Sequence, residues 1–376
     1  MKQSLYLLLP LFFAGFVVQE DNCSNTNAHQ QPVQGSQFDG PYVLYLDKQL
    51  FVKYVYDDSG TRSIRVDSFP LAQKETLQLT VATDIPGKTF PVTLKKGLEN
   101  EKTDFPDVKK MFVVSDIEGN FAAFRKLLQA QQIIDSSFNW AFGNGHLVLT
   151  GDFFDRGAQV TEVLWLIYSL EEKAKAAGGY VHFILGNHEI MNMSGDIRYV
   201  HPKYTDNALL MNEGYMNLFS EHSELGAWLR TKNIVEKVGP VLFVHGGISA
   251  EVNNSSLSAA KMNKLARPFY PDSSYNYKDN KVALLYSDLG PFWYRGYYTG
   301  KTLASQAQVD STLDIYGVKY IATGHTVVAD TISVRFNKKL FNTDVHHAKG
   351  HTEGLYYEEG RFYRATPFGE KFEIAD

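Results

Sequence analysis

MFVVSD at residues 111–116 is the first of three stretches that decide the fold, because each is a short apolar run that ends in polar residues. HLVLTGD at 146–152 and YVHFILGN at 180–187 follow the same pattern. The first two are each followed by a segment with helical spacing of its apolar residues, FAAFRKLLQAQQII and VTEVLWLIYSLEEKAKAAGG. This alternation predicts buried strands joined by amphipathic helices, with the polar residues gathered at the carboxyl ends of the strands.

Later stretches extend this pattern toward the C-terminus. VGPVLFVHGG at 238–247 and VKYIATGH at 318–325 are again apolar runs that end in a histidine. The segments DTISVRFNKKLFNTDV and GLYYEEGRFYRATPFGEKFEI alternate apolar and polar residues, which predicts further antiparallel strands. We therefore expect residues 108–376 to form one α+β or α/β domain, in which two mixed β-sheets are flanked by helices.

The N-terminal part of the chain has a different texture. Residues 39–105 alternate apolar and polar positions between Gly, Pro and Asp-Ser-Gly turns, which predicts a small β-rich accessory segment. Residues 19–38 are polar and read as a linker. The apolar run at 4–18 follows Lys2 and is shorter than the ~20 residues that cross a bilayer, so we interpret residues 1–18 as a signal peptide.

Composition limits the class of protein. The chain has 376 residues, a net charge of −5 and 44% hydrophobic residues, which is typical of a globular protein and argues against a general nucleic-acid binder. Its one cysteine, Cys23, excludes an intrachain disulfide. We expect a protein exported to the periplasm or the extracellular space, without stable membrane insertion once the signal peptide is cleaved. A membrane anchor formed by the N-terminal run is the alternative.

Five motifs in fixed order carry the functional signal. They are DIEGN from Asp116, GDFFDRG from Gly151, GNHE from Gly186, HGG from His245 and GH from Gly324. This series resembles the calcineurin-like metallophosphoesterases and, within them, the phosphoprotein phosphatase branch. GPFWYRGYY, from Gly290, resembles the Shewanella-like protein phosphatases. The resemblance implies a calcineurin-like four-layer sandwich with a small N-terminal β extension.

The resemblance also implies a site for two divalent metal ions. Asp116 and the residue at position 118 would hold the first ion, and Asp152 would bridge both. Asn187, His245 and His325 would complete the second site. Mixed Asp, Asn and His ligands suit Mn, Fe or Zn, with Mg possible. Two such ions can share a hydroxide that attacks phosphorus in line with the leaving oxygen.

Further residues would act on the phosphate ester itself. His188 would protonate the leaving oxygen, and Asp155 would orient its imidazole and raise its pKa. Arg156 and Arg295 would hold the phosphoryl oxygens, because a guanidinium group matches their geometry. The implied activity is hydrolysis of a phosphomonoester, either phosphotyrosine or phosphoserine/threonine in a protein or a small phosphomonoester.

Glu118 departs from the family pattern, which usually has histidine at this position. A carboxylate adds negative charge and a harder ligand, so we expect activity to survive with a preference for Mn or Mg over Zn. A catalytically impaired protein that binds metal and phosphate is one alternative. A hydrolase of nucleotides or dinucleoside polyphosphates, as in neighbouring branches of the superfamily, is the other.

Overall fold

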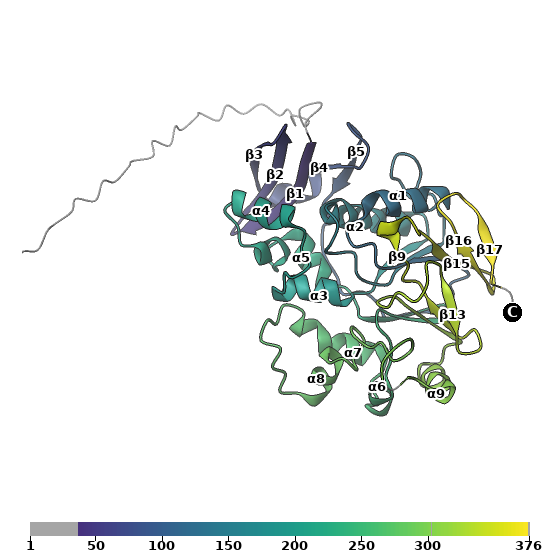
Figure 1. Cartoon of the computed structure of the whole chain (residues 1–376). Coiled ribbons are helices and arrows are strands. Elements are labelled where there is room, and N and C mark those ends of the chain that lie inside the picture. Colours follow the sequence, from purple (N-terminus) through teal and green to yellow (C-terminus); the bar gives the residue numbers. More distant parts are fainter. Residues whose placement is uncertain (1–36, 302, 375–376) are drawn as a thin grey trace, which may run out of the picture. The chain divides into compact units, whose positions relative to one another are not determined.

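The computed structural model describes residues 37–301 and 303–374 (Figure 1). These residues belong to one compact unit, Val33–Asp376. The expected signal peptide, Cys23 and most of the expected linker lie outside the described residues. Within the described ranges, no helix has the length and apolar character that crossing a membrane requires.

Two six-stranded mixed sheets form the centre of the fold. The first sheet has the strand order β13 (Ser333–Arg335), β14 (Leu340–Asn342), β12 (Tyr320–Thr323), β11 (Val241–Val244), β10 (Val235–Val238) and β6 (Asp104–Phe105). The second has the order β17 (Lys371–Glu373), β16 (Arg361–Ala365), β15 (Gly354–Glu358), β7 (Lys110–Val114), β8 (His146–Leu149) and β9 (Tyr180–Phe183). The predicted fold class is confirmed.

Strand directions decide where polar residues gather. In the second sheet β7, β8 and β9 are parallel, as the repeated apolar runs predict. In the first sheet β11, β12 and β14 are parallel. The sequence predicts antiparallel strands in the C-terminal segments, which is right for β13 with β14 and for β15 to β17. It does not predict that β14 also pairs in parallel with β12.

The alternation of side chains along each strand explains why two sheets pack together. In β7, Met111 and Val113 belong to one buried cluster with Val148 of β8 and with Val241 and Phe243 of β11, which places this cluster between the sheets. The intervening residues of β7 belong to the larger cluster that also contains the helices. Each sheet is therefore buried on both faces.

The helices cover the outer faces of the sheets. They are α1 (Phe121–Ala130), α2 (Val160–Ala176), α3 (Asn187–Ser194), α4 (Pro202–Leu210), α5 (Glu224–Leu229), α6 (Ala250–Asn254), α7 (Ala259–Ala266), α8 (Asn280–Tyr286) and α9 (Gln306–Tyr316) (Figure 1). Helix α2 packs on β9 and α1 packs on α2, whereas α7 packs on β10. Short 3-10 turns follow α4 at Tyr215–Phe219 and α7 at Arg267–Phe269, and another follows strand β14 at His347–Lys349.

The N-terminal segment forms two small antiparallel sheets. They contain β1 (Gln37–Leu46), β2 (Gln49–Asp58) and β3 (Thr61–Pro70), and then, after a 3-10 turn at Leu71–Thr76, β4 (Gln78–Ala82) and β5 (Thr89–Thr93). Strands β1, β4 and β5 contact α2. Because these strands cover its outer side, α2 is buried on almost every side along its first three turns, whereas its sequence predicts an amphipathic helix.

Candidate metallophosphoesterase active site

The parallel strands bring the predicted polar residues to one place. Each of them follows the carboxyl end of a strand, within four residues of its last position. They are Asp116 after β7, Asp152 after β8, Asn187 after β9, His245 after β11 and His325 after β12. Because β7, β8 and β9 are parallel in one sheet and β11 and β12 are parallel in the other, the loops that follow these strands lie together, as the sequence predicts.

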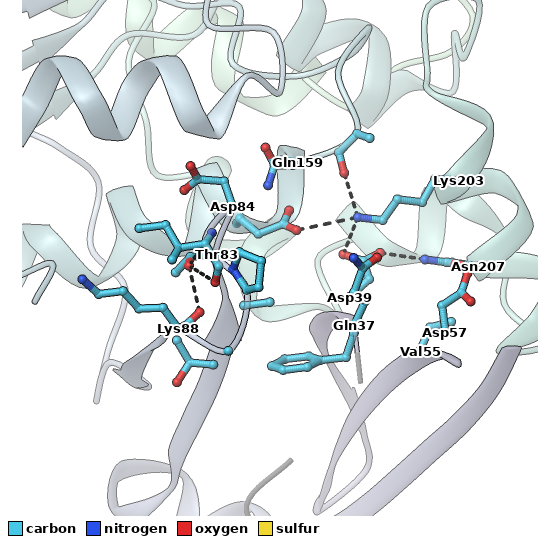
Figure 2. A pocket seen from close by; sticks show the side chains of 18 of the residues that line it. Gln37, Asp39, Val55, Asp57, Thr83, Asp84, Lys88, Gln159, Lys203 and Asn207 are labelled. Carbon is cyan, nitrogen blue, oxygen red and sulfur yellow. Dashed lines mark hydrogen bonds and ion pairs between the residues drawn. The ribbon is translucent and has the colours of Figure 1, made fainter. Parts of the chain in front are cut away.

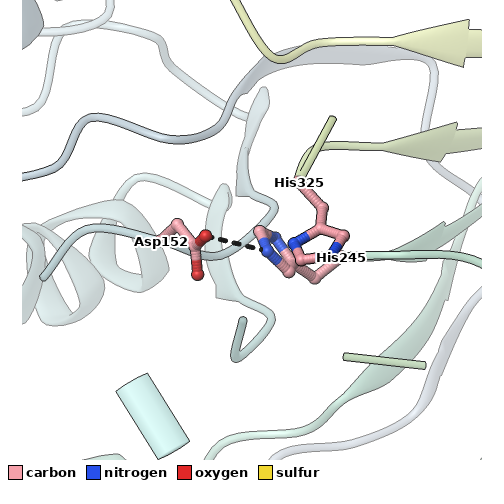
Figure 3. A group of neighbouring side chains, drawn as sticks. All are labelled: Asp152, His245 and His325. Carbon is pink, nitrogen blue, oxygen red and sulfur yellow. Dashed lines mark ion pairs between the residues drawn. The ribbon is translucent and has the colours of Figure 1, made fainter. Parts of the chain in front are cut away.

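One group of ligand atoms is formed by Asp152, His245 and His325, whose candidate atoms lie within 4.8 Å of one another (Figure 3). His245 Nε2 lies 3.0 Å from Asp152 Oδ2 and 3.0 Å from Asn187 Oδ1. We call these four residues the second metal site.

Hydrogen bonds orient both imidazoles of the second metal site. His245 Nδ1 donates to the carbonyl oxygen of Thr150 at 2.7 Å, which leaves Nε2 facing Asp152. His325 Nε2 donates to the carbonyl oxygen of Trp293 at 3.2 Å, which leaves its Nδ1 atom for the site. A backbone acceptor on the far nitrogen is the usual arrangement of a histidine that binds a metal.

A second group contains Glu118, Asp152 and His188, again within 4.8 Å. Asp116 lies beside it, and both of its carboxylate oxygens accept the backbone N–H of His325 at 3.2 Å. We call Asp116, Glu118 and Asp152 the first metal site. Glu118 Oε1 also forms an ion pair with Arg156, so this glutamate contacts a cationic side chain as well as the group of ligands.

The acid–base pair predicted from the sequence is formed. His188 Nδ1 lies 2.5 Å from Asp155 Oδ2, and both residues are buried. Burial favours a lower pKa for His188, but the charge of Asp152 and the hydrogen bond to Asp155 outweigh it and raise that pKa above its usual value. These two carboxylates therefore favour the protonated form of His188.

Three residues that the sequence analysis did not single out hold these groups in place. Asn192 Nδ2 donates to Asp155 Oδ1 at 2.8 Å, one helical turn after His188. Glu189 accepts the backbone N–H groups of Asp152 at 2.9 Å and of Phe153 at 2.7 Å. Asp344, after β14, is buried beside Asp116. Glu189 could have been found from the sequence because it is the last residue of the GNHE motif. Asn192 could have been found because it lies four residues after His188, on the same face of the helix.

A pocket of about 400 Å³ opens over these residues. Seven of the predicted residues line it: Asp116, Glu118, Asp152, Arg156, His188, Arg295 and His325. Asn187, His245 and Asp155 do not line it, and all three are buried. Arg295 Nη1 donates to the carbonyl oxygen of His325 at 2.6 Å, which fixes its guanidinium group in the pocket lining.

Backbone strain is concentrated in the same loops. Six of the predicted residues have a positive φ between 48° and 70°: Asp116, Glu118, Asp152, Asp155, Arg156 and His325. Such angles cost on the order of 1–3 kcal/mol for a residue with a Cβ atom and persist where the surrounding structure enforces them. The loop around Asp152 is closely packed, since a Cβ on Gly186 would overlap Asp152 Oδ1.

A larger pocket of about 540 Å³ lies between the N-terminal strands and α2 and α4 (Figure 2). It contains none of the predicted site residues. Its buried charges are paired, since Lys203 Nζ lies 3.1 Å from Asp39 Oδ1 and donates to the carbonyl oxygen of Ala158 at 2.7 Å. Size alone does not mark the active site, and the smaller pocket carries the chemistry.

The ordered motifs belong to a known sequence family, because residues 109–329 match the calcineurin-like phosphoesterases. The chain belongs to this family. As a calcineurin-like phosphoesterase it is a hydrolase that uses divalent metal ions, and its donor set of carboxylates, one amide and two oriented imidazoles fits such ions.

Relatives with known names are phosphatases. The crystal structure of a cold-active protein-tyrosine phosphatase from a psychrophilic Shewanella species is 35% identical and covers 90% of this calcineurin-like phosphoesterase and 100% of its own chain, with a TM-score of 0.81. Shewanella-like protein phosphatase 1 of Plasmodium berghei is 27% identical over 265 residues, which are 64% of this chain and 70% of that protein.

A third relative represents the neighbouring branch. The symmetrical bis(5'-nucleosyl)-tetraphosphatase of Buchnera aphidicola subsp. Acyrthosiphon pisum is 31% identical over 145 residues, which are 37% of this calcineurin-like phosphoesterase and 45% of that protein. The match to the phosphatases is longer and includes more of the fold.

Proposed function

We propose that this protein is an exported protein phosphatase that hydrolyses phosphomonoesters of protein side chains and prefers phosphotyrosine. The observation that carries the proposal is the contact between His188 and Asp155 at the floor of a pocket that also contains Arg156 and Arg295. A proton donor for the leaving oxygen and two guanidinium groups for the phosphoryl oxygens together suit a phosphate monoester.

The proposed metal ligands form two sets. Asp116, Glu118 and Asp152 hold the first ion, and Asp152, Asn187, His245 and His325 hold the second. When bound, two divalent ions lower the pKa of water and neutralise charge on the phosphoryl group. We propose Mn²⁺ as the ion that gives the most active protein, because the first site contains carboxylates alone.

The side chains act on the substrate in a defined order. Arg156 exchanges its contact with Glu118 for the phosphoryl oxygens. Arg295, held by the carbonyl oxygen of His325, also binds them. The ester oxygen then faces His188 Nε2, since Nδ1 of that ring is bound to Asp155. As water attacks phosphorus and the bond to the ester oxygen breaks, His188 gives its proton from Nε2 to that oxygen, so that phosphate and the free hydroxyl group are the products. Asp155 stabilises the imidazole throughout.

Tyr199 supports an aryl leaving group. Its ring centroid lies 5.3 Å from that of His188 and 5.7 Å from the guanidinium carbon of Arg156, and the residue is 45% exposed. Its carbonyl oxygen accepts the backbone N–H of Arg156 at 2.9 Å, which ties it to the catalytic loop. Because His188 faces the leaving oxygen, the group attached to that oxygen lies next to this ring.

The test is a substrate panel with the Mn²⁺-loaded protein. We expect higher kcat/KM for a phosphotyrosine peptide than for the same peptide with phosphoserine, and little hydrolysis of diadenosine tetraphosphate. In Tyr199→Leu the preference for phosphotyrosine should fall about 3- to 10-fold, equivalent to ~1 kcal/mol of ring contact. Phe368→Leu, at an exposed ring outside the pocket, is the matched control. Faster hydrolysis of the dinucleotide than of either peptide would contradict the proposal.

Export is proposed on the apolar run at 4–18 that follows Lys2. Mass spectrometry of the protein from fractionated cells should find the chain without residues 1–18 outside the cytoplasm. Recovery of the intact N-terminus from the cytoplasm would contradict it.

A further inference from the structure

Asp344 is a buried carboxylate that the proposed mechanism does not use. It lies two residues beyond the end of β14, is 5% exposed, and lines the same pocket as Asp116, Glu118 and Asp152. Its carboxyl group contacts that of Asp116. Because β14 runs parallel to β12, this turn reaches the same edge of the sheet as His325.

Hydrogen bonds fix the turn that carries Asp344. Its backbone N–H donates to Asn342 Oδ1 at 2.9 Å, and Asn342 Nδ2 donates to the carbonyl oxygen of Thr326 at 2.7 Å. Thr343 Oγ1 lies 3.0 Å from Ser115 Oγ, next to Asp116. The position of the carboxylate beside the first metal site is therefore set by the end of β14.

The charges of Arg156 and Arg295 reach Asp344, but each guanidinium group is also engaged by another residue. Arg156 pairs with Glu118, and Arg295 Nη1 donates to the carbonyl oxygen of His325 and to Thr326 Oγ1. Two buried carboxyl groups in contact repel each other unless a proton or a cation lies between them. A divalent ion held by both would remove this repulsion.

A buried imidazole nitrogen in the same pocket lining also lacks a partner. His347 is 3% exposed and lines this pocket, and its Nε2 atom donates to the carbonyl oxygen of Ser115 at 3.1 Å. Its Nδ1 atom has no hydrogen-bond partner among the described residues. The ring contacts Ser115, the residue before Asp116. A buried acceptor nitrogen of this kind can accept a hydrogen bond from a water molecule that is bound to a metal ion.

We propose that Asp344 is an additional ligand of the first metal ion, which is then held by carboxylate oxygens of Asp116, Glu118, Asp152 and Asp344. Glu118 contributes through its second oxygen, since Oε1 faces Arg156. A site of oxygen ligands alone selects a hard ion, Mn²⁺ or Mg²⁺, over Zn²⁺. The inference rests on the metal centre of the proposed function and extends its ligand set.

The test measures metal binding and requires no substrate. Metal-free protein is titrated with Mn²⁺, and the free ion is followed by electron paramagnetic resonance. The wild type should bind two ions. Asp344→Asn should keep one and bind the other at least tenfold more weakly, whereas Asp330→Asn, at an exposed aspartate beside His346, should match the wild type.

The outcomes separate this inference from the proposed function. Two wild-type affinities in a folded Asp344→Asn variant would overturn it. If that variant does not fold by circular dichroism, Asp344→Glu is titrated instead, and the longer side chain should again weaken one ion. Wild-type protein that binds two Mn²⁺ ions and shows weakened binding in the variant, but hydrolyses no phosphomonoester, would overturn the proposed function and leave the role of Asp344 standing.

Discussion

His188 shows how single residues in this site depend on their neighbours. The ring is held by Asp155 at Nδ1, Asp155 is held by Asn192, and the hydroxyl group of Tyr215 donates to Asn192 Oδ1. This chain of hydrogen bonds fixes which nitrogen faces the pocket. The proposed proton donor is therefore His188 Nε2, and kinetic measurements can test this role.

We expect His188→Asn to lower kcat by about 10²- to 10⁴-fold for a phosphoserine peptide, whose leaving oxygen needs a proton. The loss should be much smaller for p-nitrophenyl phosphate, because nitrophenolate leaves without one. The measurement is steady-state kinetics on both substrates at pH 7. Equal losses on the two substrates would show that His188 acts in another way.

At this scale the sequence predicted the residues that follow apolar strands, such as Asp152 and His245, because the motif order and the strand ends coincide. Asp344 follows a strand too, but LFNTDV matches none of the motifs. Its place beside Asp116 depends on β14 pairing in parallel with β12, which alternation of apolar and polar residues cannot distinguish from antiparallel pairing.

A row of polar side chains runs from β8 and β9 of the second sheet to β10 of the first. His146 Nδ1 lies 2.8 Å from His182 Nε2, and His182 Nδ1 lies 2.7 Å from Glu236 Oε2. Burial and the charge of His182 lower the pKa of His146 to about 4. The unfolded chain, where this pKa is near 6.5, therefore binds more protons than the folded protein between these two values.

It follows that the free energy of unfolding is independent of this group above about pH 6.5 and decreases as the pH falls toward 4. After allowance for solvent screening of the half-buried ring, the loss is about 1–2 kcal/mol. Urea unfolding of the wild type and of His146→Gln at pH 7.5 and pH 5 measures it. The variant should lose less stability than the wild type between the two pH values, and parallel losses would contradict the assignment to His146.

The burial of helix α2 depends on strands that are distant in the sequence. Its sequence has the apolar spacing of a helix, and the helix is present at Val160–Ala176. Its burial on nearly every side comes from β1, β4 and β5, which are more than 65 residues earlier in the chain. Periodicity predicts the element but not which distant strands cover it.

For the whole molecule, Glu171 of α2 connects the N-terminal segment to the sheets. It is 2% exposed, pairs with Lys95 just after β5, and lies 2.7 Å from Lys232 Nζ just before β10. Its Oε1 atom also accepts the indole N–H of Trp228 at 2.9 Å. One carboxylate thus neutralises two buried lysines from distant parts of the chain.

We expect Glu171→Gln to lower the free energy of unfolding by about 3–5 kcal/mol, because it leaves the buried charge of Lys95 without its carboxylate partner and leaves Lys232 with Glu101 alone. Activity of the folded fraction should stay near that of the wild type, since Glu171 lies outside the active-site pocket. Glu172→Gln, at the exposed neighbour, is the control and should change stability little. Similar unfolding curves for both variants would contradict this account of how the segment is attached.

The division into a β-rich segment at 39–105 and a catalytic domain at 108–376 stays a prediction. The described residues of both parts share one buried cluster, and β6 at Asp104–Phe105 pairs with β10 of the first sheet. Composition indicated the change of texture between the two parts. It could not indicate that the N-terminal strands complete the burial of α2.

Asp152 is the proposed ligand that both metal ions share, so it is the residue on which the account depends most. The most direct measurement is kcat/KM of the Mn²⁺-loaded protein on a phosphotyrosine peptide, for the wild type and for Asp152→Asn, with bound metal quantified in both. We predict that the variant loses at least about 10³-fold in kcat/KM and retains fewer than two ions. Full hydrolysis by Asp152→Asn would contradict the two-metal phosphatase.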